Sequence, residues 1–121
     1  MKVFMKKVLI VDDDDFVLEY VDGILQDYYE VMTALDGSIG YEQYQKHKPD
    51  LVIIDLVMPV MDGYELIDKI KESGDDPEII ILTGAPDEIK KKLTYYKIKA
   101  VVTKPFKNND FLKTVRGVLD T

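Results

Sequence analysis

The chain has 121 residues, a formal net charge of −7, 46% hydrophobic residues and 32% charged residues, which is typical of one folded domain rather than a disordered segment. No apolar run approaches the roughly 20 residues of a membrane-spanning helix, and the N-terminus lacks the apolar stretch of a secretory signal. The acidic excess argues against direct nucleic-acid binding. The absence of cysteine excludes thiolate metal sites and suits a cytoplasmic protein.

Short apolar runs predict five strands at Lys7–Val11, Val31–Ala34, Leu51–Ile54, Ile79–Leu82 and Ala100–Thr103. The runs Leu51–Ile54 and Ile79–Leu82 are apolar without alternation. This pattern predicts strands that helices cover on both faces of the sheet.

A helix is predicted after each strand, and the clearest is an apolar stripe of Phe16, Val17, Tyr20, Val21, Ile24, Leu25 and Tyr28. The second helix is predicted over Ser38–Lys46, after a turn at Asp36-Gly37, and Gly40 is expected to weaken it. The third is predicted around Leu66, Ile67 and Ile70, and the fifth over Phe111–Leu119. The fourth is predicted after Pro86, with Ile89 and Leu93 facing inward and Lys90, Lys91 and Lys92 facing outward. Alternating strands and helices predict an α/β fold, with a five-stranded doubly wound parallel sheet and five helices.

Polar residues follow the predicted strands at the point where each strand ends. They are Asp12 and Asp13, Asp55, Thr83 and Lys104. Because parallel strands end at the same edge of a sheet, we expect these side chains to meet in one crevice.

Three carboxylates in one crevice need compensation, because two of them ~4 Å apart repel by about 4 kcal/mol at an effective dielectric constant of 20. Lys104 supplies one positive charge, and Mg²⁺ is the expected cation, since the cluster offers oxygen ligands and neither His nor Cys. An aspartate beside Mg²⁺ and a lysine can attack phosphorus as a nucleophile. Asp55 is the predicted nucleophile because it ends the central strand.

The acidic row VDDDD is predicted to divide into two pairs. Asp12 and Asp13 end the first strand and belong to the cation site. Asp14 and Asp15 directly precede the first helix, where aspartate commonly caps the N-terminus and complements the helix dipole.

Together, the segments VDDDD, LVIIDLVMPVMDG, IILTGAP and VVTKPF resemble the receiver domain of two-component response regulators, of the stand-alone chemotaxis type. The resemblance covers residues 6–119 as one domain and implies a flavodoxin-like sheet with strand order 2-1-3-4-5. It also implies that Asp55 is the phosphoacceptor. Asp13 would bind Mg²⁺ directly, Asp12 directly or through water, and the backbone carbonyl of Val57 would supply a further ligand beside Asp55.

The same resemblance gives roles to the ends of the last two strands. Thr83 matches the switch hydroxyl that turns toward the phosphoryl group, and Lys104 matches the lysine that pairs with that group. The Lys104-Pro105 peptide bond is expected to be cis, and Gly63 matches the turn glycine after the phosphorylation loop.

The implied phosphodonor is a sensor histidine kinase or a histidine phosphotransfer protein, and the downstream target is not specified. No membrane contact is expected, and the protein is expected to be a monomer or a weak dimer. Because no output domain follows Thr121, we expect either a stand-alone receiver or a receiver cut from a longer regulator.

One departure concerns the residue three positions before Lys104, which is Val101 where receivers usually carry Tyr or Phe. It leaves the output mechanism open and supports an alternative, a receiver-fold binding or scaffold module that no longer signals through phosphate. A hydrolase of the aspartyl-phosphate type is disfavoured, because VDDDD is not followed by the small hydroxyl residue expected there.

Overall fold

The computed structural model describes residues 5–58, 61–89 and 94–120. Strands and helices alternate through this part of the chain, in the order β1 (Lys7–Val11), α1 (Asp15–Leu25), β2 (Glu30–Ala34), α2 (Gly37–His47), β3 (Leu51–Asp55), α3 (Gly63–Glu72), β4 (Glu78–Thr83), the 3₁₀ turn η1 (Pro86–Glu88), β5 (Ala100–Thr103) and α4 (Asn108–Leu119).

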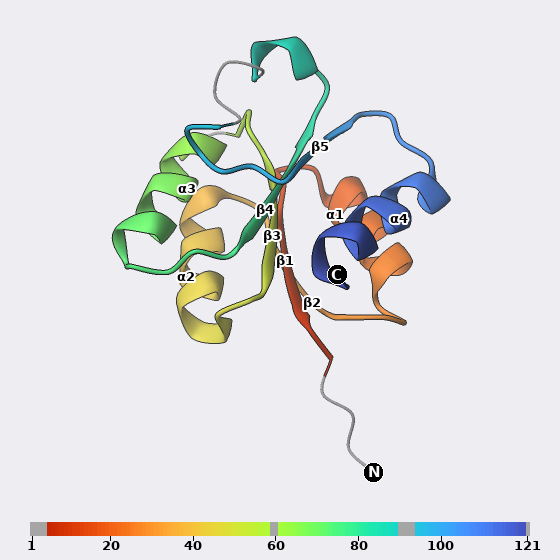
Figure 1. Ribbon diagram of the computed structural model, residues 1–121, viewed down its shortest axis with the longest axis horizontal. Coiled ribbons are helices and arrows are strands. Elements are labelled where there is room, and N and C mark those ends of the chain that lie inside the picture. The colour runs from red at the N-terminus through yellow and green to blue at the C-terminus, as the bar shows by residue number, and fades with distance from the viewer. Residues whose placement is uncertain (1–4, 59–60, 90–93, 121) are drawn as a thin grey trace.

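All five strands are parallel and lie in the order β2-β1-β3-β4-β5. Figure 1 shows α2 and α3 on one face of this sheet and α1 and α4 on the other. The predicted α/β fold and strand order are therefore confirmed. Among the described helices, none has the length and apolar character needed to cross a membrane.

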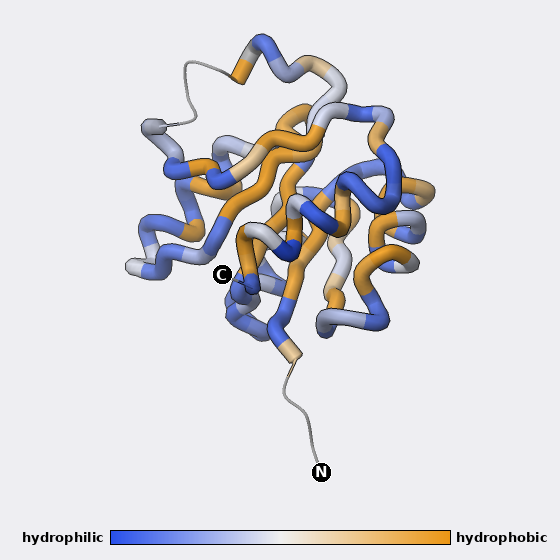
Figure 2. The backbone as a smooth tube through the Cα atoms, turned by 45° about the vertical axis from the view of Figure 1, so that its right-hand side comes forward, coloured by the Kyte–Doolittle hydropathy of each residue, from blue (hydrophilic) through white to orange (hydrophobic). Residues whose placement is uncertain are grey.

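The sheet separates two hydrophobic cores, because successive side chains of a strand point to opposite faces. In β3, Leu51 and Ile53 pack with α1 and α4, whereas Val52 and Ile54 pack with α2 and α3. Figure 2 shows the hydrophobic strands running through the middle of the molecule. Burial on both faces explains why the central strands read as uninterrupted apolar runs.

The buried face of α1 differs from the predicted stripe, which included Phe16 and Tyr20 and omitted Leu18. Its buried residues are Leu18, Val21 and Leu25, while Phe16 is 82% exposed and Tyr20 is 47% exposed. The spacing i, i+3, i+7 of Leu18, Val21 and Leu25 sets the face toward the sheet, which turns Phe16 and Tyr20 toward solvent.

Helix α2 begins at Gly37, and the Asp36 side chain caps it by accepting a hydrogen bond from the Ile39 backbone N–H at 2.8 Å. The predicted turn pair Asp36-Gly37 thus forms the helix start. Gly40, predicted to weaken this helix, permits a close approach: a Cβ there would lie 3.0 Å from Cγ2 of Val11. The tight contact between α2 and β1 outweighs the low helix propensity of glycine.

The described residues contain four α-helices where five were predicted. After β4, the Ile89 backbone N–H donates to the Pro86 carbonyl, the i to i+3 pattern of a 3₁₀ turn rather than an α-helix. Ile89 is buried, as predicted for an inward residue. The predicted outward lysines, residues 90–92, and residue 93 lie outside the described residues.

Candidate functional site

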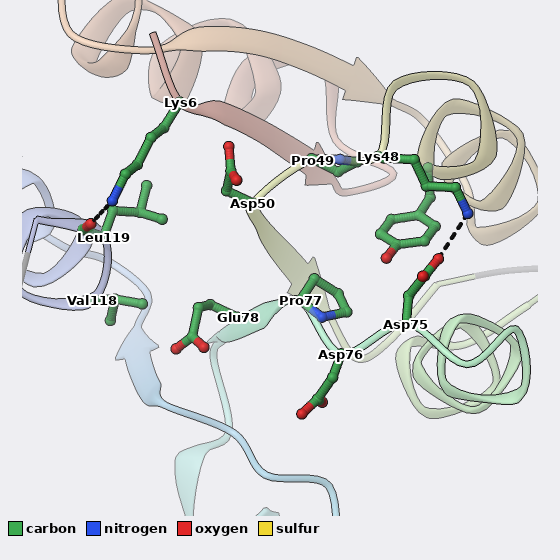
Figure 3. A pocket seen from close by; sticks show the side chains of 11 residues that line it. Lys6, Lys48, Pro49, Asp50, Asp75, Asp76, Pro77, Glu78, Val118 and Leu119 are labelled. Carbon is green, nitrogen blue, oxygen red and sulfur yellow. Dashed lines mark hydrogen bonds and ion pairs between the residues drawn. The ribbon is translucent and has the colours of Figure 1, made fainter.

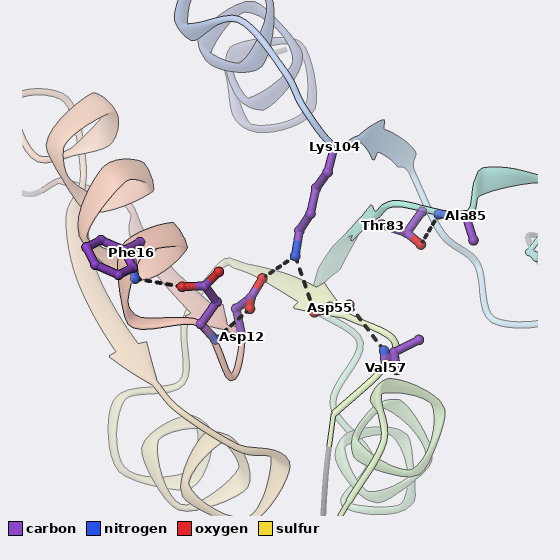
Figure 4. Close-up of polar contacts among 8 residues, drawn as sticks. Asp12, Phe16, Asp55, Val57, Thr83, Ala85 and Lys104 are labelled. Atoms are coloured by element: carbon purple, nitrogen blue, oxygen red, sulfur yellow. Dashed lines mark hydrogen bonds and ion pairs between the residues drawn. The ribbon is translucent and has the colours of Figure 1, made fainter.

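Two of the polar residues predicted to meet at the carboxyl edge of the sheet, Asp12 and Asp55, lie around the Lys104 ammonium, as Figure 4 shows. The Lys104 Nζ atom lies 2.8 Å from Oδ2 of Asp12 and 3.3 Å from Oδ2 of Asp55. Carboxylate oxygens of Asp12, Asp13 and Asp55 all lie within 4.8 Å of one another. Residues from three different strand ends therefore form one charged cluster.

The acidic row divides close to the predicted point: Asp14 caps α1, as predicted, whereas Asp15 is the first residue of the helix and not a cap. The cation-binding role of Asp12 and Asp13 stays a prediction. Asp12 is fully buried, and its Oδ1 atom accepts a hydrogen bond from the Asp14 backbone N–H at 2.9 Å. The Asp14 side chain accepts from the Phe16 backbone N–H at 2.9 Å and is the N-cap of α1, while Asp15 lies in the first helical turn. The turn thus holds Asp12 inward and uses Asp14 to start the helix.

Asp55 ends β3 and is only 8% exposed. Its Oδ1 atom accepts a hydrogen bond from the Val57 backbone N–H at 3.1 Å, and Gly63 permits the start of α3 to press against the end of this strand. A Cβ at Gly63 would lie 2.9 Å from the Asp55 carbonyl oxygen, so a larger residue would displace the strand end that carries the carboxylate.

The environment of Asp55 disfavours its charged form. Burial raises the pKa of Asp55 above its ordinary value, and the charge of Asp12 raises it further. The Val57 hydrogen bond and the Lys104 ammonium oppose this shift without cancelling it. The carboxylate consequently gains from any additional cation in the cluster.

Both the backbone and the ammonium group of Lys104 are fixed by polar contacts. Its backbone N–H donates to the Thr83 carbonyl at 2.8 Å, and the Lys104-Pro105 peptide bond is cis, as expected. Burial alone lowers the pKa of Lys104, but the hydrogen bond and charge of Asp12, reinforced by Asp55, outweigh burial and raise it. The ammonium therefore stays charged between the two carboxylates.

Thr83 lies at the end of β4, in the same edge of the sheet, and is 3% exposed. Its Oγ1 atom accepts a hydrogen bond from the Ala85 backbone N–H at 3.0 Å, within its own turn. Figure 4 shows this bond beside the Asp55 and Lys104 contacts. Thr83 thus lies at the same edge of the sheet as the charged cluster, and its hydroxyl is engaged with the β4–η1 loop.

The residues present fit a magnesium ion. Three carboxylates converge on one point, and only oxygen atoms are offered by this cluster, which are the ligands that Mg²⁺ prefers. Asp13 is exposed while Asp12 is buried, so one side of the cluster faces solvent and leaves room for water or phosphate oxygens. The Val57 carbonyl as a further ligand stays a prediction.

The division of the acidic row can be tested with two variants. Asp14→Ala is expected to lower the free energy of unfolding by about 1 kcal/mol, because the helix loses its cap, and to leave Mg²⁺ affinity unchanged. Asp13→Ala is expected to weaken Mg²⁺ binding at least ~10-fold, because one carboxylate charge is lost beside the cation. Urea denaturation and calorimetric Mg²⁺ titration measure the two effects, and equal Mg²⁺ weakening in both variants would contradict the division.

A separate hollow of about 700 Å³ lies near the opposite edge of the sheet, where Figure 3 shows Asp50, Asp75, Asp76 and Glu78. Its acidic groups already have ion-pair or hydrogen-bond partners. Asp75 pairs with Lys48 at 2.7 Å, and the Asp50 side chain accepts from the Lys7 backbone N–H at 2.8 Å. Paired in this way, they do not form a second charged site.

Comparison with known proteins agrees with this geometry. A family model described as "Response regulator receiver domain" matches residues 8–116. The chain is 34% identical to the chemotaxis protein CheY of Halobacterium salinarum, covering 94% of this chain and 97% of that protein. It is 33% identical to the probable transcriptional regulator ycf27 of Cyanophora paradoxa, covering 98% of this chain and about half (50%) of that regulator. The crystal structure of chemotaxis protein CheY4 of Vibrio cholerae superposes with a TM-score of 0.87 at 35% identity, covering 95% of this chain and 99% of that one.

Proposed function

Because this chain belongs to the response regulator receiver domains of two-component signalling, we propose that Asp55 is its phosphoacceptor and that Asp12, Asp13 and Asp55 hold the Mg²⁺ ion that the reaction requires. The observation that carries the proposal is the convergence of three carboxylates and the Lys104 ammonium around the buried end of β3. Receiver domains of this kind accept phosphoryl groups from histidine kinases. We propose a sensor kinase or a histidine phosphotransfer protein as the donor here.

In the proposed reaction, an Asp55 carboxylate oxygen attacks phosphorus in line with the leaving histidine. A phosphorus–oxygen bond forms as the phosphorus–nitrogen bond breaks, and the imidazole keeps the electron pair. Mg²⁺, when bound, neutralises charge on the transferred phosphoryl oxygens. The Lys104 ammonium supplies a second positive charge on the same side, and the Val57 N–H orients the attacking carboxylate.

Phosphorylation would also change the hydrogen bonding of Thr83. We propose that its hydroxyl turns from the Ala85 N–H toward a phosphoryl oxygen, which releases the β4–η1 loop. A local charge would then bias a two-state element of the fold. Val101 lies half-buried against the core between the sheet and helices α2 and α3, so the readout would not depend on an aromatic ring at this position.

The domain is a signalling module rather than a member of a classical enzyme family. We propose in addition that it hydrolyses its own aspartyl phosphate, that residues 6–119 form the receiver unit, and that it acts as a monomer or weak dimer. A cytoplasmic location, expected from the lack of cysteine, completes the proposal.

The test is incubation of the protein with acetyl phosphate and Mg²⁺, followed by intact-mass spectrometry. The expected result is a mass gain of one phosphoryl group that disappears when EDTA removes the metal. No mass gain under conditions that phosphorylate a known receiver would overturn the proposal and favour the scaffold alternative.

A further inference from the structure

Three aromatic rings pack together beside the charged cluster, and the middle one, Phe106, belongs to the loop that carries Lys104. The Phe106 ring stacks on Phe111 of α4 with ring centroids 4.8 Å apart. On its other side it meets Tyr20 of α1, with centroids 5.8 Å apart. The Tyr20 hydroxyl also donates a hydrogen bond to Oδ1 of Asn108, at the start of α4. Rings from two helices therefore clamp a residue two positions after Lys104.

Two of these rings, Tyr20 and Phe106, line a hollow that borders the charged cluster. It has a volume of about 560 Å³ and is lined by Phe16, Val17, Tyr20, Lys104, Pro105 and Phe106. Lys104 thus belongs both to this apolar surface and to the ion pairs with the carboxylates. Contacts that fix Phe106 also limit where the Lys104 backbone can lie.

Lys104 needs such support, because a lysine stem has four flexible carbons and its ammonium must lie between two carboxylates. Its backbone N–H is tied to the Thr83 carbonyl on the β4 side. Phe106 supplies the tie on the other side. Tyr20 extends that tie to α1, the helix that begins at Asp15, the last residue of the acidic row.

Core packing alone does not account for Tyr20, the outer ring of the three. Phe111 is 1% exposed and belongs to the core, whereas Tyr20 is 47% exposed and lies outside the core cluster. What Tyr20 does contribute is a contact between α1 and the Lys104 loop. Its position suits the control of geometry better than stability.

We propose that Tyr20 and Phe106 form a positioning clamp that holds the Lys104 ammonium where a phosphoryl oxygen binds. The clamp rests on the phosphoryl site proposed above and assigns it two residues that touch neither the phosphoryl group nor the metal. Its loss would loosen Lys104 while leaving the three carboxylates in place. Phosphoryl binding would fall, and Mg²⁺ binding would not.

The test compares Tyr20→Leu and Phe106→Leu with the unchanged protein, using calorimetric titration with Mg²⁺ and then with beryllofluoride, a phosphoryl mimic, at saturating Mg²⁺. Both variants are expected to bind beryllofluoride roughly 10-fold more weakly, because small misplacements of a charged group are costly at such sites. Their Mg²⁺ affinity is expected to stay within about twofold. Tyr20→Phe, which keeps the ring, is expected to restore beryllofluoride binding.

Tyr28→Leu is the matched control. Tyr28 is 44% exposed and also bridges to α4, through the Arg116 guanidinium 4.3 Å from its ring centre, but Arg116 lies in the last turn of α4, away from Lys104. This variant is expected to bind both ligands as the unchanged protein does. Thermal denaturation of each variant separates loss of fold from loss of positioning, and Tyr20→Leu carries the test if Phe106→Leu fails to fold.

The outcomes distinguish the clamp from the proposed function. Failure of the unchanged protein to bind beryllofluoride with Mg²⁺ would overturn the phosphoryl site, and the clamp with it. If the unchanged protein binds and Tyr20→Leu binds equally well, the clamp alone is overturned. Parallel loss of Mg²⁺ and beryllofluoride binding in Tyr20→Leu would likewise overturn it, since that pattern marks a general disturbance of the site.

Discussion

Asp55→Asn is expected to reduce phosphorylation by acetyl phosphate at least ~1000-fold, because the amide lacks the nucleophilic oxygen of the carboxylate. Intact-mass spectrometry after incubation with Mg²⁺ measures the loss. Asp50→Asn makes the same chemical change at the opposite edge of the sheet, beside Lys7, and is expected to be phosphorylated normally. Phosphorylation of Asp55→Asn at the rate of the unchanged protein would place the acceptor elsewhere.

The same substitution is expected to stabilise the fold at neutral pH. Burial raises the pKa of Asp55 in the folded state, so folding favours the protonated carboxyl. The stability associated with this raised pKa is present below the unfolded value of about 3.8 and is lost as pH rises through the folded value. An amide does not ionise, so Asp55→Asn avoids that loss.

The gain expected from Asp55→Asn is of the order of 1 kcal/mol at pH 7 without Mg²⁺. It should shrink as pH falls below the folded pKa of Asp55, and it should also shrink when Mg²⁺ is added, because the ion stabilises only the ionised cluster. Urea denaturation at several pH values measures the difference. A gain that is independent of pH would show that ionisation of the buried Asp55 carboxyl does not lower the stability of the fold.

Lys104→Met is expected to distinguish the contribution of the Lys104 ammonium from that of Mg²⁺. Removing the ammonium leaves the fully buried Asp12 without its ion-pair partner, which should lower the free energy of unfolding by about 2 to 3 kcal/mol, discounted for the 27% exposure of Lys104. Mg²⁺ affinity should rise about 10-fold, because a competing positive charge is gone. Phosphorylation should nevertheless fall, since one charge that stabilises the phosphoryl oxygens is missing.

Calorimetric Mg²⁺ titration and phosphorylation rates measure these opposite changes. Lys99→Met is the control, since Lys99 and Glu78 form an exposed ion pair at 3.7 Å, and its loss should change stability by less than ~1 kcal/mol. Weaker Mg²⁺ binding in Lys104→Met would contradict a direct competition between the two cations.

Most of the sheet and the membership of the charged cluster could be predicted from the sequence. The apolar runs of β1, β3 and β4 are long enough and uniform enough to identify buried parallel strands. Parallel strands end at one edge, so the first polar residues after them had to converge. The preference of aspartate for helix N-caps also distinguished Asp14 from Asp12, because an N-cap contact joins residues only a few positions apart.

Side-chain exposure and loop contacts depended on the tertiary structure instead. Periodicity placed Phe16 and Tyr20 on the inward stripe of α1, but packing against the sheet selected Leu18 and turned both rings outward. The reason for a glycine at position 40 is likewise the short distance to Val11, which belongs to another element. No window of sequence contains such a distance.

The acidic row VDDDD shows where local sequence information ends. By itself the sequence determined that these carboxylates stand between a buried strand and a helix, and it assigned the second pair, Asp14 and Asp15, to the helix start. Only the folded chain decided that Asp12 is completely buried and paired with Lys104, a residue 92 positions away, at 2.8 Å. The reason is physical: capping is a contact between neighbours, whereas compensation of a buried charge requires a partner that the fold brings across the sheet.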